Sequence, residues 1–192
     1  MRLLGAVLAG GRSRRFGSDK GQAEIDGTAL LQRVCNALAS QCERVCVVGR
    51  TLEGYASAPD RPEPGLGPLG GVLGALLFAR DNRFDEVLTS ALDIPDLPPD
   101  LAERLAPAPA FVADQPVVGR WRVGDIPALE QLLSPDGPAI GSASMRAFCA
   151  ACDARPVALP HPLANINTPA DLAKYRAARS VAGPGALSSS GS

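Results

Sequence analysis

The chain is organised around a short N-terminal stretch that reads Leu8-Ala9-Gly10-Gly11-Arg12-Ser13-Arg14-Arg15-Phe16-Gly17-Ser18-Asp19-Lys20. It continues the apolar run 3–8, which predicts a buried strand that ends at a pair of glycines. Glycine has no Cβ, so the backbone N–H groups of Gly10 and Gly11 can approach a phosphate closely. The arginines and Lys20 supply positive charge. The stretch therefore predicts a polyphosphate-binding loop.

Two common phosphate-binding motifs do not fit this loop. A P-loop has four residues between its first glycine and a Gly-Lys-Ser/Thr, but five separate Gly11 from Gly17, and Ser18 stands where the lysine belongs. The dinucleotide fingerprint Gly-x-Gly-x-x-Gly is broken by Arg12 and Arg14. The loop belongs to a different class of nucleotide site, or it is a glycine-rich turn with a solvated basic rim.

Composition indicates a globular protein that binds a small anion. The 192 residues are 46% hydrophobic and 20% charged, and we expect one domain over residues 1–180 with a flexible tail or an added remnant at 181–192. The net charge is −1, so the chain has no overall positive field that would attract nucleic acid or a membrane. Its basic residues gather in the N-terminal stretch, which favours a small anionic ligand. No apolar run spans a bilayer and no signal-peptide cleavage pattern follows the N-terminus, so we expect a cytoplasmic protein.

The five cysteines give little functional signal. Cys35 and Cys46 lie in apolar, periodic surroundings typical of core residues. Cys149-Ala-Ala-Cys152 has redox or metal-site spacing, but no second cysteine pair or histidine cluster completes a zinc site. We expect a structural role for this pair.

The first half of the chain alternates strand and helix signals. Residues 23–27 predict a short extended piece closed by an Asp-Gly turn, Thr28 is expected to cap a helix, and residues 45–48 predict a buried strand that ends at Gly49. This order is typical of a doubly wound α/β sheet, in which ligands bind at the carboxyl ends of the strands. Gly10, Gly11 and Gly49 should therefore share one rim.

An irregular segment and a glycine-rich helix are expected next. Residues 51–65 are rich in proline and predict a surface loop. Pro68 suits the first turn of a helix, and Gly70, Gly71 and Gly74 indicate that this helix packs closely or approaches a ligand.

Residues 86–92 predict a third apolar strand, which runs into Asp93-Ile94-Pro95. A carboxylate at the carboxyl end of a buried strand is well placed to bind a hard cation that bridges to phosphate. Asp93 could also serve as an ordinary turn or cap residue.

The last third of the chain carries one further signal. Helices are expected at 99–105, from Asp125 to residue 133 and at 142–152, and strands at 110–113, 116–123 and 156–159. The segment 165–172 reads Asn165-Ile166-Asn167-Thr168-Pro169-Ala170-Asp171-Leu172. Within it, the pattern Thr168-Pro169-x-Asp171 predicts the start of a final helix. Asn165 and Asn167 are two apart on an extended piece, so they point the same way and offer donors and acceptors. His161 has no partner in sequence and is assigned no role.

These motifs together resemble the molybdenum cofactor guanylyltransferases, the MobA family of nucleotidyltransferases. The N-terminal stretch matches the signature Leu-Ala-Gly-Gly-x-Ser-x-Arg-Met-Gly-x-Asp-Lys, and the 67–71 element, Asp93 and the 165–172 segment match further family elements. The chain departs from the family pattern at Phe16, Leu92, Asp96 and Gln115.

The resemblance implies a fold and a reaction. It implies a three-layer, Rossmann-like nucleotidyltransferase fold with a mostly parallel central sheet flanked by helices. The implied reaction transfers GMP from GTP to molybdopterin with Mg²⁺ and releases pyrophosphate, and contact with molybdoenzyme maturation proteins is expected. Alternatives are a relative that uses CTP or another acceptor, and a nucleotide-binding relative without turnover.

The resemblance also assigns roles to residues of this chain. Catalysis is expected from Arg15, Lys20 and Asp93, and metal binding from Asp93. Asn165 and Asn167 are expected to bind the acceptor. The nucleotide is expected to contact Leu8, Ala9, Gly10, Gly11, Lys20, Asp60 and Asp93. Asp60 is included because it lies seven residues before Gly67, although an aspartate in a proline-rich loop is also ordinary turn chemistry.

Overall fold

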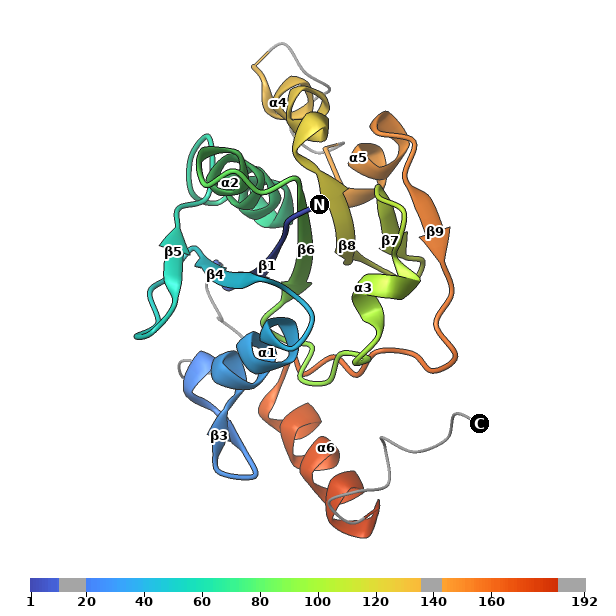
Figure 1. Ribbon diagram of the computed structural model, residues 1–192. Helices are drawn as coiled ribbons and strands as arrows, with labels where there is room; N and C mark the ends of the chain where they lie inside the picture. The colour runs from blue at the N-terminus through green and yellow to red at the C-terminus, as the bar shows by residue number, and fades with distance from the viewer. Residues whose placement is uncertain (11–19, 136–142, 183–192) are drawn as a thin grey trace.

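The computed structural model describes residues 1–10, 20–135 and 143–182 of the chain. Within these residues seven strands form the main sheet (Figure 1). From one edge to the other they are β5 (Ala56–Ala58), β4 (Arg44–Val48), β1 (Leu3–Leu8), β6 (Glu86–Ala91), β8 (Gln115–Arg122), β7 (Ala110–Val112) and β9 (Arg155–Val157).

The sheet is mostly parallel, as expected. β1 pairs in parallel with β4 and with β6, β4 pairs in parallel with β5, and β7 pairs in parallel with β9. Among the described strands of this sheet, only β8 runs antiparallel to its neighbours, which are β6 and β7. The carboxyl ends of β1, β4 and β6 therefore meet at one edge, where an α/β sheet places its ligand.

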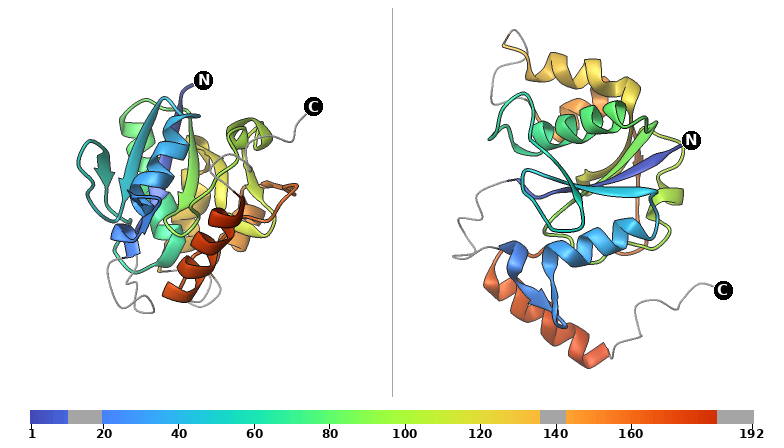
Figure 2. Two further views of the ribbon diagram at one scale, coloured as in Figure 1. Left: turned by 90° about the horizontal axis from the view of Figure 1, so that it is seen from below. Right: turned by 60° about the vertical axis from the view of Figure 1, so that its left-hand side comes forward.

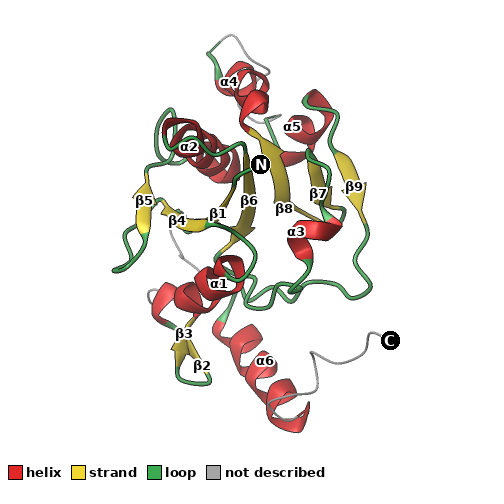
Figure 3. Ribbon diagram, in the orientation of Figure 1, coloured by secondary structure: helices red, strands yellow, loops and turns green. Residues whose placement is uncertain are grey.

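Helices cover both faces of the sheet and complete three layers (Figures 1 and 3). The side chains of β1 alternate, so Leu4, Ala6 and Leu8 pack on one face and Val7 on the other. One face carries α2 (Gly67–Asp81), α4 (Ile126–Leu133) and α5 (Met145–Ala151). The other carries α1 (Leu30–Ala39), α3 (Leu101–Arg104) and the first turn of α6 (Pro169–Ala182).

A small hairpin lies outside the main sheet and precedes α1 in the sequence. It follows the 3₁₀ turn η1 (Lys20–Gln22) and consists of β2 (Glu24–Ile25) and β3 (Thr28–Ala29). Asp26 and Gly27 both have positive φ, of 52° and 75°, which is the two-residue turn expected for an Asp-Gly pair. Figure 2 shows α6 running beside this hairpin, away from the sheet.

Three local expectations are wrong. Thr28 does not cap α1: it lies in β3, and the helix begins at Leu30 with no side-chain cap. The segment 51–65 is not irregular throughout, because Ala56–Ala58 forms the edge strand β5. Asp125 precedes α4, but its carboxylate accepts hydrogen bonds from the backbone N–H and guanidinium of Arg122, at 2.9 Å in each case, and does not cap the helix.

The C-terminal helix extends slightly past the expected boundary. α6 includes residues 181 and 182, so the domain end placed after residue 180 falls inside the helix. The rest of the expected tail, 183–192, lies outside the described residues. None of the helices that the structure describes is both long and apolar enough to cross a membrane.

All five cysteines are free thiols. Cys35 and Cys46 are buried in the core, as expected. Cys149 and Cys152 are buried at the end of α5, in the core that contains Phe148. Burial raises the pKa of Cys149 to about 12 and that of Cys152 to about 11, which disfavours the reactive thiolate.

Candidate active site

Two glycines bring the ends of β1 and β4 together at the carboxyl edge of the sheet. Gly10 follows β1, and Gly49 follows β4 with a φ of +84°. A Cβ on Gly49 would lie 2.5 Å from the Cα of Gly10, which is closer than carbon atoms can pack. Close backbone contact therefore requires Gly49, and it holds Gly10 against the end of β4.

Asp60 turns its carboxylate toward this pair of strand ends. It lies two residues after β5, and a Cβ on Gly10 would come within 2.7 Å of its Oδ2 atom. A Cβ on Gly71 of α2 would lie 3.5 Å from its Oδ1 atom. Burial raises the pKa of Asp60, because the charged carboxylate is partly removed from water.

The glycines of α2 are explained mainly by packing. A Cβ on Gly74 would lie 2.1 Å from the carbonyl oxygen of Pro59, and one on Gly70 would lie 3.1 Å from that of Arg61. The backbone N–H of Arg61 also donates to the carbonyl of Gly70 at 3.0 Å. The glycine face of α2 thus holds the 59–61 segment, and Asp60 with it, against the helix.

Lys20 and Asp93 meet in the centre of the site. The Nζ atom of Lys20 lies 3.5 Å from Oδ2 of Asp93, which follows β6, and the two side chains are 10% and 24% exposed. Burial lowers the pKa of Lys20, whereas the carboxylates of Asp93 and, more weakly, Asp171 favour its charged form. The site therefore holds a partly desolvated ammonium group beside a carboxylate.

A cavity of about 280 Å³ joins these groups. This volume is near the lower end of small-molecule sites, so it suits part of a nucleotide. Six residues expected to bind nucleotide line it: Leu8, Ala9, Gly10, Lys20, Asp60 and Asp93. The structure thus brings every described member of that set to one place. The expectations for Gly11 and Arg15 lie outside the described residues.

The asparagine segment lies next to Asp93 but does not line the cavity. The backbone N–H of Ile166 donates to the carbonyl oxygen of Asp93 at 2.8 Å, and the Ile166 side chain is buried. The flanking Asn165 and Asn167 are exposed. The carboxylate of Asp171 accepts from the backbone N–H of Asn167 at 3.0 Å, which fixes the segment to the start of α6.

Other cavity and rim residues were missed by sequence reasoning. Val117 of β8 lines the cavity, and a valine in a strand carries no chemical signal that could have revealed it. Gly67 and Pro68 line it too; the sequence signals there were the start of a helix and the match of the 67–71 element to the family, and neither assigned these two residues to the site. Arg50 donates from Nε to the carbonyl oxygen of Ala9 at 3.2 Å; an arginine directly after the strand-ending Gly49 was a usable signal.

The site fits a magnesium ion that arrives with a nucleotide better than a resident metal. The described part of the chain contains no group of three or more histidine, cysteine or acidic side chains that could hold an ion. Mg²⁺ in nucleotide sites is usually held by one or two carboxylates together with substrate phosphates. The partly exposed carboxylate of Asp93 has the chemistry that such a ligand requires.

The fold, with a cavity for part of a nucleotide at the carboxyl edge of the sheet, defines a nucleotide-binding protein of the α/β class. The molybdopterin-guanine dinucleotide biosynthesis protein A of Archaeoglobus fulgidus shares the fold with a TM-score of 0.71 at 20% identity, over 91% of this chain and 97% of that one. Residues 5–184 match the MobA-like NTP transferase domain, so the chain belongs to that family. Its members use a divalent metal ion.

Two relatives cover nearly the whole chain. It is 39% identical to the molybdenum cofactor guanylyltransferase of Rhodobacter capsulatus, over 91% of this chain and 95% of that protein. It is 33% identical to the protein of the same name from Rhizobium johnstonii, over 88% of this chain and 90% of that protein.

Proposed function

We propose that the chain transfers GMP from GTP to molybdopterin, forming the guanine dinucleotide cofactor and releasing pyrophosphate. Its relatives are guanylyltransferases by name. The observation that carries the proposal within this chain is the Lys20–Asp93 pair, which lies in a cavity beside the backbone of Gly10. A metal–triphosphate complex is bound by a cation and exposed backbone N–H groups on its phosphates and by a carboxylate on its metal, and the site offers groups of these kinds.

Residues on the nucleotide side have distinct proposed roles. The backbone of Leu8, Ala9 and Gly10, continued by Gly11, forms the seat of the triphosphate. Lys20, assisted by Arg15, neutralises charge that develops on the departing pyrophosphate. Asp60 accepts hydrogen bonds from the nucleoside, because an ionised carboxylate offers only acceptors.

Asp93 is the proposed ligand of Mg²⁺. When bound, the ion would neutralise charge on the phosphate oxygens, which makes the α-phosphorus more susceptible to attack by an anionic nucleophile. Asp93 holds its carboxylate at the end of β6, and the hydrogen bond from Ile166 fixes its backbone there. The backbone that carries the carboxylate is thereby held beside the segment of Asn165 and Asn167.

Asn165 and Asn167 are proposed to orient the acceptor. They are exposed on either side of the buried Ile166, next to Asp93, and offer both donors and acceptors. The terminal phosphate of molybdopterin is already an anion, so the reaction needs positioning and charge neutralisation more than a general base. A bond forms from its oxygen to the α-phosphorus as the bond to pyrophosphate breaks.

Pyrophosphate release with molybdopterin, Mg²⁺ and each of the four NTPs tests the proposal. Release with GTP supports it, and preferential release with CTP would favour the related cytidylyl reaction. If the protein binds GTP but releases no pyrophosphate with any acceptor, the proposal is overturned in favour of a nucleotide-binding protein without turnover. Contact with molybdoenzyme maturation proteins in the cytoplasm is a further part of the proposal, testable by pull-down from cells that produce the cofactor.

A further inference from the structure

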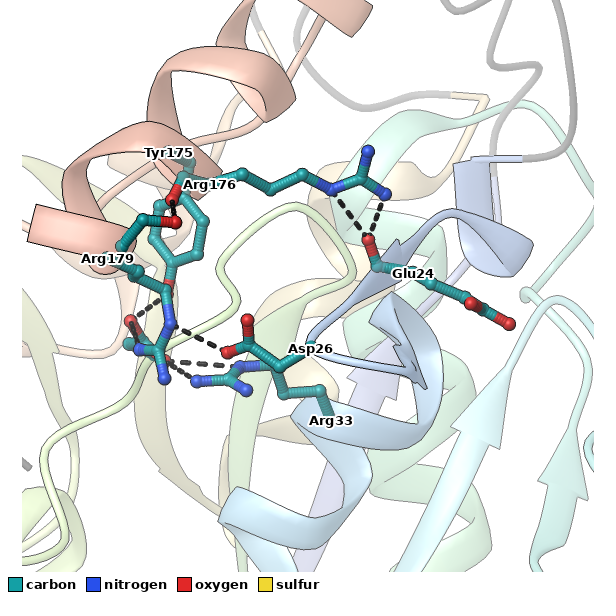
Figure 4. Close-up of polar contacts among 8 residues, drawn as sticks. Glu24, Asp26, Arg33, Tyr175, Arg176 and Arg179 are labelled. Carbon is teal, nitrogen blue, oxygen red and sulfur yellow. Dashed lines mark hydrogen bonds and ion pairs between the residues drawn. The ribbon is translucent and has the colours of Figure 1, made fainter. Parts of the chain in front are cut away.

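Asp96 is the centre of a polar cluster that joins α1 and α6, and Figure 4 labels its partners Arg33, Tyr175 and Arg179. Its Oδ1 atom accepts from the guanidinium of Arg33 in α1, with Nη2 at 2.7 Å. Its Oδ2 atom accepts from the hydroxyl of Tyr175 and lies 3.5 Å from Nη1 of Arg179, both in α6. One carboxylate thus joins two helices through its two oxygens.

The same face of α6 also binds the β2–β3 hairpin. Nε of Arg179 donates to Oδ2 of Asp26 at 3.0 Å, in the hairpin turn. Nε of Arg176 donates to the carbonyl oxygen of Glu24 at 3.0 Å. Figure 4 shows the Arg176 and Arg179 side chains reaching from α6 toward the hairpin. The hairpin follows Lys20 directly, and the N–H of Ala23 donates to the Lys20 carbonyl at 3.2 Å.

These contacts connect the three segments that carry the proposed active-site groups. Asp96 lies three residues after Asp93, and Ile94 and Pro95 between them are buried, so the loop between the two carboxylates is packed. α6 follows the Asn165–Asn167 segment, whose Ile166 donates to Asp93. The hairpin follows Lys20. A shift of α6 would therefore move the asparagines relative to Lys20 and Asp93.

The cluster is too exposed for its main effect to be on folding. The side chains of Arg33, Asp96 and Arg179 are 22%, 36% and 23% exposed. Ion pairs at this exposure contribute little to stability individually, because water screens them. Their directional hydrogen bonds still define where α6 lies, since few apolar side chains of α6 reach the core: Leu172 is buried and Tyr175 is half-buried.

We propose that Asp96 is a positioning residue for the transfer reaction. By joining α1 and α6 next to Asp93, it sets the position of the acceptor-binding segment relative to the nucleotide-binding groups. The inference rests on the proposed function for its kinetic consequence, and on the contacts above for its structural one. Displacement of reacting groups by about 1 Å can reduce rates by about 10²-fold. Asp96 can therefore affect turnover without contacting the substrate.

Asp96→Asn tests the inference, because it keeps the shape of the side chain and removes its charge. We expect kcat to fall about 10-fold or more, with the affinity for GTP within about twofold of the wild type. Amide hydrogen exchange at Ile166 should become faster, which a variant that leaves α6 in place would not show. Asp100→Asn is the matched control, because Asp100 forms a comparable half-exposed ion pair with Arg104 and neither residue lines the cavity.

A second variant separates positioning from general destabilisation. Tyr175→Phe should reduce kcat in the wild type but add less to Asp96→Asn, because both variants weaken the same contact between Asp96 and α6. Wild-type kcat together with unchanged Ile166 exchange in Asp96→Asn would overturn the inference, as would additive losses in the double variant. If the wild type shows no guanylyl transfer, the proposed function fails, and the Ile166 exchange rate alone then decides whether Asp96 fixes the segment.

Discussion

The ammonium group of Lys20 lies 3.5 Å from the carboxylate of Asp93, although one residue precedes the first hairpin and the other follows β6. Each side chain is the other's counterion in the absence of nucleotide. A magnesium–triphosphate complex offers each a stronger partner, because the metal attracts the carboxylate and the phosphates attract the ammonium. The pair therefore keeps a buried ammonium group and a partly exposed carboxylate compensated until substrate replaces it.

Removal of either member of the pair should abolish turnover. For Lys20→Ala and for Asp93→Ala we expect a loss of ~10²-fold or more in kcat, because each contact stabilises charge that develops in the transition state. Steady-state pyrophosphate release measures the loss, and circular dichroism checks the fold. Asp81→Ala, which removes one member of an exposed ion pair with Arg80, serves as control. Near-normal rates in either site variant would refute the assigned roles.

As the pH rises, nucleotide binding should weaken at a lower pH than it would if Lys20 had the pKa of an ordinary lysine. Burial lowers the pKa of Lys20 from its usual 10.5, so the side chain loses its positive charge at a lower pH. Below that pKa the ammonium attracts the triphosphate, and above it the attraction is lost. Binding of a fluorescent GTP analogue between about pH 7 and about pH 10 should show this decline.

Lys20→Arg provides the control for that titration. Arginine stays protonated throughout this range, so the variant should bind the analogue with no decline assignable to residue 20, even if its affinity is lower. The same decline in Lys20→Arg as in the wild type would assign the titration to another group.

Gly74→Ala should destabilise the protein and weaken GTP binding. The new Cβ would meet the carbonyl oxygen of Pro59 at 2.1 Å, so the segment that carries Asp60 must move. Although alanine favours a helix by about 1 kcal/mol, we expect a net loss of about 1–3 kcal/mol from overpacking. Chemical denaturation measures it. Gly124→Ala is the control, because its Cβ meets nothing within 4 Å. Equal stability of the two variants would contradict the packing role of Gly74.

The native cysteines should resist alkylation. Burial raises the pKa of Cys35, Cys42 and Cys46 to about 12, and Cys149 and Cys152 are affected similarly. The thiolate that reacts with iodoacetamide is therefore scarce near neutral pH. Mass spectrometry should find slow labelling in the folded protein and rapid labelling in denaturant. Fast native labelling of Cys149 or Cys152 would instead indicate a reactive site.

The sheet and the main site elements were predictable because their signals are local. Apolar runs end in Gly10, Gly49 and Asp93, and parallel strands bring their carboxyl ends to one edge, so the rim followed from strand order alone. Long-range partners could not be predicted in this way. β5 is only three residues long and gains its place by pairing with β4.

Side-chain contacts across the fold were beyond the sequence signals too. Asp96 was noticed only as a departure from the family pattern, and its role depends on Arg33, Tyr175 and Arg179, which come from distant segments. At Thr28 a local signal was misleading. The residue type favours a helix cap, but Thr28 pairs with Ile25 in the hairpin instead. Val117 reaches the cavity only because β8 pairs beside β6.

A crystal structure with Mg²⁺ and a non-hydrolysable GTP analogue tests the central claim most directly. We expect the Lys20–Asp93 pair to be separated, with Nζ of Lys20 on a phosphate oxygen and the Asp93 carboxylate on the metal. A bound nucleotide that leaves Lys20 paired with Asp93 and contacts neither residue would contradict the account.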